Sequence, residues 1–171
     1  YLSHIPNITI SAPCCVEEQE QLMNLALEHI SDKKTGPFII RYPAYDNYSH
    51  SRQYILDNPC VYGKSLLMNE EKDSYDIAII TIGKMVNNAM DVACELEKLG
   101  YNVCVFNARF LCPLDIEGLE KVILKAKCYM TIEDGVKIGG FGSNVVCAMT
   151  EKGVNKRLSI VGLPDEPIPH G

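Results

Sequence analysis

A regular alternation of strand-like and helix-like segments after Pro59 constrains this chain more than any other sequence feature. Five short apolar segments have the pattern of strands: residues 61–68, 76–82, 102–106, 127–132 and 157–162. Helix-like segments separate the later ones: residues 84–99, a helix capped by Asp115 that runs through Ala126, and a third from the glycines at 139–142 through Met149. This order predicts an α/β fold with a mostly parallel, doubly wound sheet, right-handed crossovers and helices on both faces.

The clearest helix pattern covers residues 84–99. Its apolar residues are spaced by four and three, which predicts one buried stripe made of Met85, Ala89, Val92, Leu96 and Leu99. Gly100 follows as a typical helix stop. The charged residues 69–73 before this region predict a surface hairpin or loop between two strands.

The first 43 residues form a separate, shorter unit. Residues 7–11 alternate like a strand, residues 17–30 have a helical period, and residues 38–42 are strand-like again. Between residues 44 and 59 the apolar period disappears, so we expect a linker there. The predicted division is therefore 1–43, a linker at 44–59, and a domain at 60–171.

Charge and hydropathy exclude two broad classes of partner. The chain has 22 acidic against 16 basic residues, a net charge of −6, and a pI near 5.2, which argues against binding nucleic acid or an anionic membrane surface. Its longest apolar stretches are far shorter than the roughly 20 residues of a membrane span.

Cysteine usage indicates a reducing, intracellular compartment. None of the eight cysteines forms a C-x-x-C pair. Four lie inside apolar strand or helix patterns, so we expect buried free thiols at Cys94, Cys104, Cys128 and Cys147. The chain opens on Tyr1 with no signal-like segment, and we expect it to be a piece of a longer protein.

Four segments, in order, resemble those of the 1-deoxy-D-xylulose-5-phosphate synthase family. They are Gly36-Pro37 with Ile40-Arg41-Tyr42-Pro43, Asn107-Ala108-Arg109-Phe110 with Pro113-Leu114-Asp115, Thr131-Ile132-Glu133-Asp134 with Gly139-Gly140-Phe141-Gly142-Ser143, and Gly162-Leu163-Pro164-Asp165 with His170-Gly171. Tyr1-Leu2, Ile5-Pro6-Asn7 and Ala12-Pro13 also resemble the end of the family's central domain. The resemblance covers nearly the whole chain.

The resemblance implies a three-domain enzyme of which only the last part is present. Residues 1–43 would be the tail of the central, pyrimidine-binding domain, and residues 60–171 a transketolase-type C-terminal domain. The full-length enzyme, a transferase, would condense pyruvate with glyceraldehyde 3-phosphate and release CO2, the first step of non-mevalonate isoprenoid synthesis, which also supplies thiamine precursors. It would be a homodimer in a bacterial cytoplasm or a plastid-like (apicoplast-like) organelle.

The same resemblance places the cofactor machinery outside this chain. Thiamine diphosphate and Mg2+ serve the full-length enzyme, but the metal motif, the activating glutamate and the catalytic histidines precede Tyr1. We therefore expect no catalytic, cofactor or metal residue here, no cofactor on this chain alone, and a structural, dimer-supporting role.

Arg41 is the candidate substrate-binding residue, because a guanidinium at the end of a strand suits a phosphate dianion. An interdomain ion pair with a carboxylate is the alternative, which we favour. The family's motif continues Arg-Tyr-Pro-Arg-Gly, and the resemblance implies that its second arginine binds the triose phosphate. This chain has Ala44 there, so Arg52 or another group would have to replace that contact.

Four further residues are candidates for interface or structural roles. Arg109 precedes a strand-to-helix turn and suits interfacial carboxylates, while Glu133 and Asp134 follow a strand without a nearby nucleophile or metal histidine. His170 is a candidate domain contact without chemistry. The glycines at 139–142 depart from G-x-G-x-x-G at Val145, which favours a tight turn over a phosphate site.

Two other functions stay open. A 2-oxo acid dehydrogenase beta subunit has a similar Arg-x-x-x-Pro-Leu-Asp turn, although the ending Gly-Leu-Pro-Asp with His-Gly fits the synthases better. A non-catalytic interaction module that keeps the fold is the second alternative, which Ala44 makes conceivable.

Overall fold

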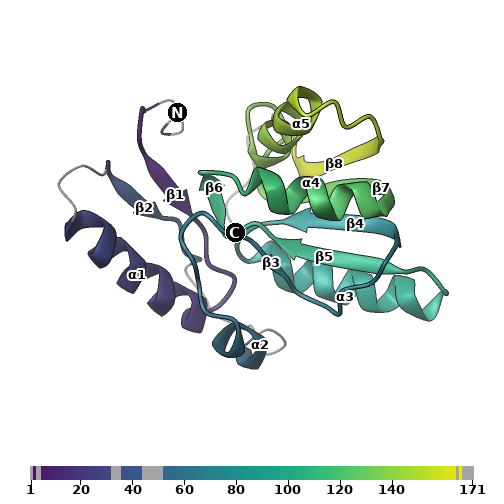
Figure 1. The fold of residues 1–171 in the computed structure, drawn as a ribbon, viewed down its shortest axis with the longest axis horizontal. Coiled ribbons are helices and arrows are strands. Elements are labelled where there is room, and N and C mark those ends of the chain that lie inside the picture. Colours follow the sequence, from purple (N-terminus) through teal and green to yellow (C-terminus); the bar gives the residue numbers. More distant parts are fainter. Residues whose placement is uncertain (1, 3–4, 32–35, 44–51, 165, 167–171) are drawn as a thin grey trace.

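The chain forms two sheets that lie beside each other (Figure 1). The computed structural model describes residue 2, residues 5–31, 36–43 and 52–164, and residue 166. The larger sheet has the strand order β3-β5-β4-β7-β8, and the smaller has the order β2-β1-β6. Ala44 and His170 lie outside the described residues.

Four parallel strands make up most of the larger sheet: β4 (Tyr75–Thr81), β5 (Val103–Asn107), β7 (Ala126–Val136) and β8 (Arg157–Leu163). The short edge strand β3 (Leu66–Leu67) runs antiparallel to β5. Since β4 pairs with β5 on one side and β7 on the other, the sheet is wound in both directions from β4.

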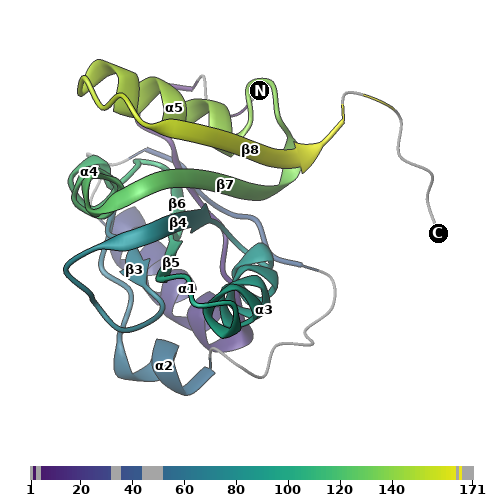
Figure 2. The ribbon, with the colours of Figure 1, turned by 90° about the vertical axis from the view of Figure 1, so that its right-hand side faces the viewer.

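Helices cover both faces of this sheet (Figure 2). Helix α3 (Met85–Lys98) packs on one face, and α4 (Ile116–Lys125) and α5 (Phe141–Glu151) pack on the other. Asp115 caps α4, because its side chain accepts a hydrogen bond from the Gly118 amide. The predicted α/β fold, with a mostly parallel sheet between helices, is confirmed.

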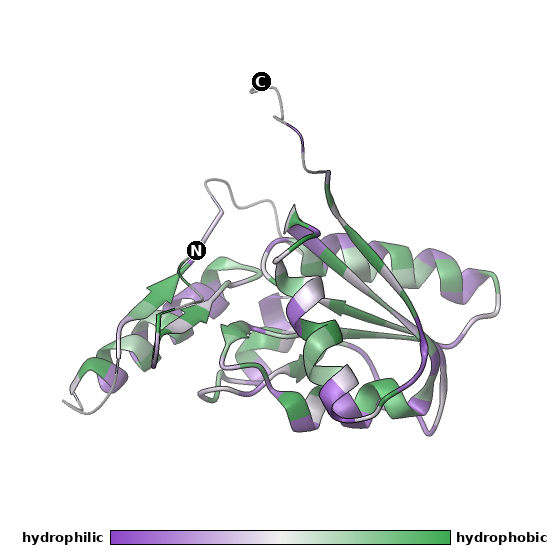
Figure 3. Ribbon diagram, turned by 90° about the horizontal axis from the view of Figure 1, so that it is seen from above, coloured by the Kyte–Doolittle hydropathy of each residue, from purple (hydrophilic) through white to green (hydrophobic). Residues whose placement is uncertain are grey.

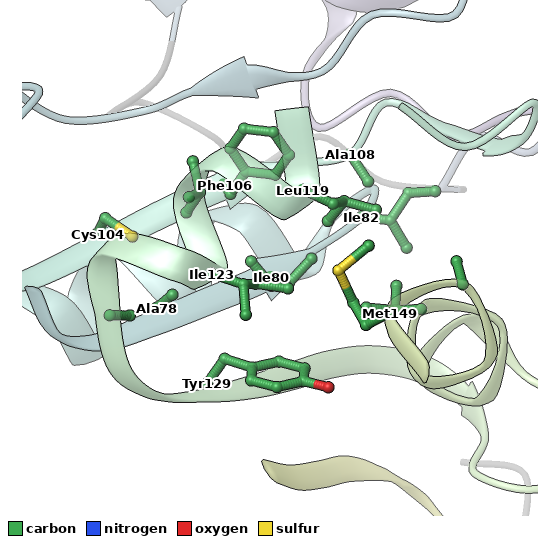
Figure 4. Packing of buried hydrophobic residues seen from close by; sticks show 14 of the residues in the cluster. Ala78, Ile80, Ile82, Cys104, Phe106, Ala108, Leu119, Ile123, Tyr129 and Met149 are labelled. Atoms are coloured by element: carbon green, nitrogen blue, oxygen red, sulfur yellow. The ribbon is translucent and has the colours of Figure 1, made fainter. Parts of the chain in front are cut away.

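The core follows from the two-residue period of β4. Ala78 and Ile80 point toward α4 and α5 and belong to the cluster with Leu119 and Met149, part of which Figure 4 shows. Ile79 points the opposite way, into the cluster under α3. A strand buried on both faces therefore needs the continuous apolar run that the sequence has here.

The first 43 residues contribute a parallel strand-helix-strand unit. Strands β1 (Thr9–Ser11) and β2 (Phe38–Ile40) pair in parallel and are connected by helix α1 (Val16–Ser31). The third strand, β6 (Phe110–Cys112), runs antiparallel to β1 and comes from the far side of the linker in sequence. Backbone pairing thus joins the two parts of the chain.

Three elements differ from the sequence expectations. Helix α2 (Arg52–Asp57) lies within the expected linker, and its buried Ile55 packs near α1. Its six residues are too few to show a helical period in the sequence. The linker at 44–59 is thus partly helical. Strand β6 was not predicted, and β3 covers only Leu66–Leu67 of the expected strand at 61–68. Because β3 pairs with β5 and not with β4, residues 69–73 form the loop, one of the two expected alternatives, and not a hairpin.

Helix α3 is confirmed, but its buried face is shifted from the predicted stripe. Val86, Ala89 and Ala93 are buried, whereas Val92 and Leu99 are exposed. Ala89 and Ala93 belong to the same buried cluster as Val103 and Val105 of β5, whereas Val92 does not.

All eight cysteines are free, including the four for which free thiols were expected, but the burial of those four differs from the prediction. Cys104 is buried and Cys128 half-buried, whereas Cys94 and Cys147 are exposed on helices. Among the described residues, no helix combines the length and apolar character that crossing a bilayer requires.

Substituting Leu119 by Ala should lower the free energy of unfolding by about 2–5 kcal/mol, because it opens a cavity beneath α4. The matched control is Leu124→Ala on the same helix, where the side chain is 54% exposed and the expected change is within about 0.5 kcal/mol. Urea denaturation followed by circular dichroism measures both. Equal losses for the two variants would contradict the packing described.

Candidate functional site

The candidate site is a cleft at the carboxyl ends of β4 and β7. In a doubly wound sheet, the crossovers leave in opposite directions at this point and open a crevice where ligands bind. Here a cavity of ≈ 210 Å³ lies between these ends, the start of α5 and the β1–β2 unit. Its lining is mostly apolar, with Ile10, Ile82 and Phe141 beside Arg41, Glu133 and Asp134.

Asp134 collects two cations at the mouth of this cleft. The guanidinium of Arg41 donates two hydrogen bonds to it, Nη1 to Oδ1 (2.5 Å) and Nη2 to Oδ2 (3.0 Å). Lys84, which follows β4, places its Nζ 3.2 Å from Oδ2. Backbone pairing fixes Arg41, whose amide donates to the Ser11 carbonyl. The ion pairs therefore connect the first 43 residues to the end of β7.

The electrostatics of this cluster favour its charged state. Burial raises the pKa of Asp134, but the hydrogen bonds and charges of Arg41 and Lys84 outweigh that effect and lower the pKa below its ordinary 3.8. The hydrogen bond to Asp134 raises the pKa of Arg41 in return. Asp134 is thus an ionised partner for cations at neutral pH.

Glu133 binds backbone amides at the amino terminus of α5. Its Oε2 accepts from the Phe141 amide (2.9 Å) and its Oε1 from the Gly142 amide (2.8 Å). A Cβ at Gly140 would lie 2.0 Å from the Val136 carbonyl oxygen, and one at Gly142 would lie 2.5 Å from Oγ1 of Thr131. The glycines therefore permit close packing around a carboxylate that already occupies the anion position of this helix.

Arg109 and Glu18 form a buried ion pair outside the cleft. Nε of Arg109 donates to Oε1 of Glu18 at 2.8 Å, and the two side chains are 3% and 0% exposed. Nη2 of Arg109 donates to the Asn58 carbonyl (2.8 Å). Glu18 also accepts from the Cys14 amide (2.7 Å) and from Nδ2 of Asn107 (3.0 Å). The pair joins α1, the end of β5 and the segment after α2.

The backbone at Arg109 is left-handed, with φ 58°. Such a residue costs about 1–3 kcal/mol and persists where its surroundings determine it. Asn107 does so here, because its Oδ1 accepts from the Arg109 amide (3.0 Å), and the Arg109 carbonyl accepts from the Ala12 amide (2.9 Å). The turn aims the guanidinium inward at Glu18.

The two carboxylates of the cleft are already bound to other groups of the protein. Both oxygens of Glu133 accept from backbone amides and both oxygens of Asp134 face cations, so neither carboxylate is placed as a general acid or base. A diphosphate does not fit the glycine turn, since Glu133 takes its amides and would repel the ligand. Within the described ranges, no cluster of three or more His, Cys, Asp or Glu could hold a metal.

Three of the predicted site residues, Arg41, Glu133 and Asp134, meet at one cleft, while Arg109 lies apart with Glu18. Arg52 pairs with Glu17 through Nε and Oε1 at 3.5 Å. Glu18 and Lys84 were not predicted as site residues, and Asn107 was noted only as part of a motif. Glu18 carries only the signal of an acid in a first helical turn, which does not distinguish a buried partner from a solvated one.

Comparisons with known proteins agree with this fold. The family model "Transketolase, C-terminal domain" matches residues 67–171. The chain is 36% identical to the 1-deoxy-D-xylulose-5-phosphate synthases of Clostridium tetani and Thermus thermophilus. Each alignment covers 100% of this chain but only 26% and 25% of the respective relative, so the chain spans about a quarter of their length.

A solved structure has the same fold. It is a split gene transketolase described as an inactive beta4 tetramer, with a TM-score of 0.78 and 24% sequence identity. The superposition covers 95% of this chain and 50% of that one. This likeness concerns the fold.

Replacing Glu18 by Gln should lower the free energy of unfolding by about 3–5 kcal/mol, because it leaves the Arg109 guanidinium buried without a counter-charge. The control is Glu95→Gln, which removes the exposed pair with Lys98 and should change stability little. Urea titration compares the two variants. Similar urea midpoints for the two variants would contradict the claim that the buried pair stabilises the fold more than the exposed pair does.

The contribution of Asp134 to stability should depend on pH. Since its folded-state pKa lies below 3.8, that contribution is fully present above pH 3.8 and is lost as the pH falls through the lower folded-state pKa. The difference in unfolding free energy between wild type and Asp134→Asn should therefore be constant from pH 7 to 5 and shrink below 3.8. A difference that grows on acidification would refute the ion-pair cluster.

Proposed function

The chain belongs to the transketolase C-terminal domain family, and we propose that it is the carboxy-terminal part of a thiamine-diphosphate-dependent 1-deoxy-D-xylulose-5-phosphate synthase. The full-length transferase would condense pyruvate with glyceraldehyde 3-phosphate and release CO2, the first step of an isoprenoid pathway. The observation that carries the proposal is the alignment of the entire chain with the last quarter of such synthases. It also favours a synthase over a 2-oxo acid dehydrogenase subunit.

This part of the enzyme would brace the active site without performing the chemistry. The Arg41–Asp134–Lys84 cluster and the Arg109–Glu18 pair connect the tail of the central domain to the C-terminal domain. Glu133 closes the glycine turn to a diphosphate, which supports the view that thiamine diphosphate and Mg2+ are bound by polypeptide preceding residue 1. We further propose a homodimer in a reducing compartment, a bacterial cytoplasm or a plastid-like organelle.

Arg41 is the residue of this chain that we assign to the substrate end of the site. Its side chain is 58% exposed although it is bound to Asp134, so one side of the guanidinium faces the solvent. Asp134 would hold that guanidinium in place while its free side attracts the phosphate of the triose. Arg109 is too deeply buried for such a contact, and its role is structural.

Two measurements test the proposal. The full-length protein should form 1-deoxy-D-xylulose 5-phosphate and CO2 from pyruvate and glyceraldehyde 3-phosphate only with thiamine diphosphate and Mg2+ present. Isothermal titration of the 171-residue chain with the same cofactors should give no binding, because Glu133 already occupies the amides of the glycine turn, where a diphosphate would bind. Micromolar affinity for the isolated chain, or a folded full-length protein without this activity, would overturn the assignment.

A further inference from the structure

Helix α1 has a second apolar face that points away from the rest of the molecule. Met23, Leu27 and Ile30 are 52%, 67% and 63% exposed, and Val16 continues the same row at the start of the helix. Spacings of seven, four and three residues place all four on one narrow stripe. We call these four residues the outer stripe of α1.

The opposite face of α1 is already used for packing. Glu18 and Leu22 are fully buried there, the former in its ion pair with Arg109. Figures 1 and 3 place α1 at the outer edge of the molecule, away from the five-stranded sheet. A helix that is apolar on two sides is typical of one that is covered on both.

The sheet behind α1 is incomplete in the same region. Among the described residues, β2 pairs with β1 on one side and leaves its other edge open. Parallel strands are normally buried within larger sheets that are covered on both faces. The open edge and the outer stripe thus both belong to the β1–α1–β2 unit.

The charge of α1 argues against a second copy of this chain as the partner of the outer stripe. Glu20 is exposed and lies beside the outer stripe on the same side of α1, four residues after Val16 and three before Met23. Helix α1 contains no Lys or Arg, and the chain has a net charge of −6. A copy of α1 would therefore bring a second carboxylate into the contact and no cation to compensate it.

We propose that the outer stripe of α1 docks against the polypeptide that precedes residue 1 in the full-length protein. The curated relatives have about three quarters of their length outside the matched region, which supplies such a partner. The docking surface on that partner is apolar and carries a basic side chain opposite Glu20. This inference rests on the proposed function only for the existence of the preceding polypeptide.

Oxidation of methionines measures the docking directly. Hydrogen peroxide should oxidise Met23 readily in the 171-residue chain and at least tenfold more slowly in the full-length protein, where the stripe is covered. Met149 is fully buried and should be protected in both, which controls for folding. Equal oxidation of Met23 in the two proteins would overturn the proposal.

A matched pair of variants gives an independent readout. Leu27→Gln should leave the urea midpoint of the 171-residue chain unchanged but lower the thermal midpoint of the full-length protein, whereas Leu124→Gln, also at an exposed position, should alter neither. Equal effects of both variants in the full-length protein would contradict the docking.

Sedimentation tests whether a second copy of this chain covers the outer stripe instead. The isolated chain should sediment as a monomer, and a dimer that Leu27→Gln dissolves would replace the proposal with self-association. Synthase activity is assayed on the same preparation. If the full-length protein has no synthase activity but Met23 is protected from oxidation, only the proposed function is refuted. If the protein is active but Met23 is oxidised as fast as in the 171-residue chain, only the docking is refuted.

Discussion

The structure depends on one buried ion pair, Arg109 with Glu18. An unpaired charge in this position would cost several kcal/mol, so each residue requires the other. Arg109 sits in a left-handed turn directly after β5, and Glu18 lies in the first turn of α1, ninety-one residues earlier. Satisfying both charges therefore holds the β1–α1–β2 unit against the end of the larger sheet. Pairing of β6 with β1 then extends the contact through the backbone.

A second set of charges closes the same junction at the cleft. Asp134 binds Arg41 from the strand-helix-strand unit and Lys84 from the turn after β4, so three segments meet at one carboxylate. Its neighbour Glu133 neutralises the amino terminus of α5. The topological switch point, which binds ligands in many α/β proteins, is here occupied by side chains that join two parts of the chain. That arrangement suits a bracing role.

The larger sheet could be predicted from the sequence, whereas the junction between the two parts of the chain could not. Continuous apolar runs such as that of β4, the cap at Asp115 and the period of α3 are local signals, and each predicted its element. Strand β6 has three residues and helix α2 has six, so their positions depend on tertiary contacts that no local period reveals. Arg41, Glu133 and Asp134 were recognised as candidates from the motifs. Glu18 and Lys84 were missed because partners at large sequence separation leave no local signature.

The β1–α1–β2 unit and the larger sheet should form one cooperative body through the buried pair. Native-state hydrogen exchange in low urea tests it most directly, by comparing the amides of α1 with those of β4 and β7. The amides of both groups should exchange with the same free energy in the wild-type chain, and in Glu18→Gln those of α1 should exchange at a lower free energy than those of β4 and β7. If α1 opens independently in the wild-type chain, the ion pair does not unite the two parts and the account is contradicted.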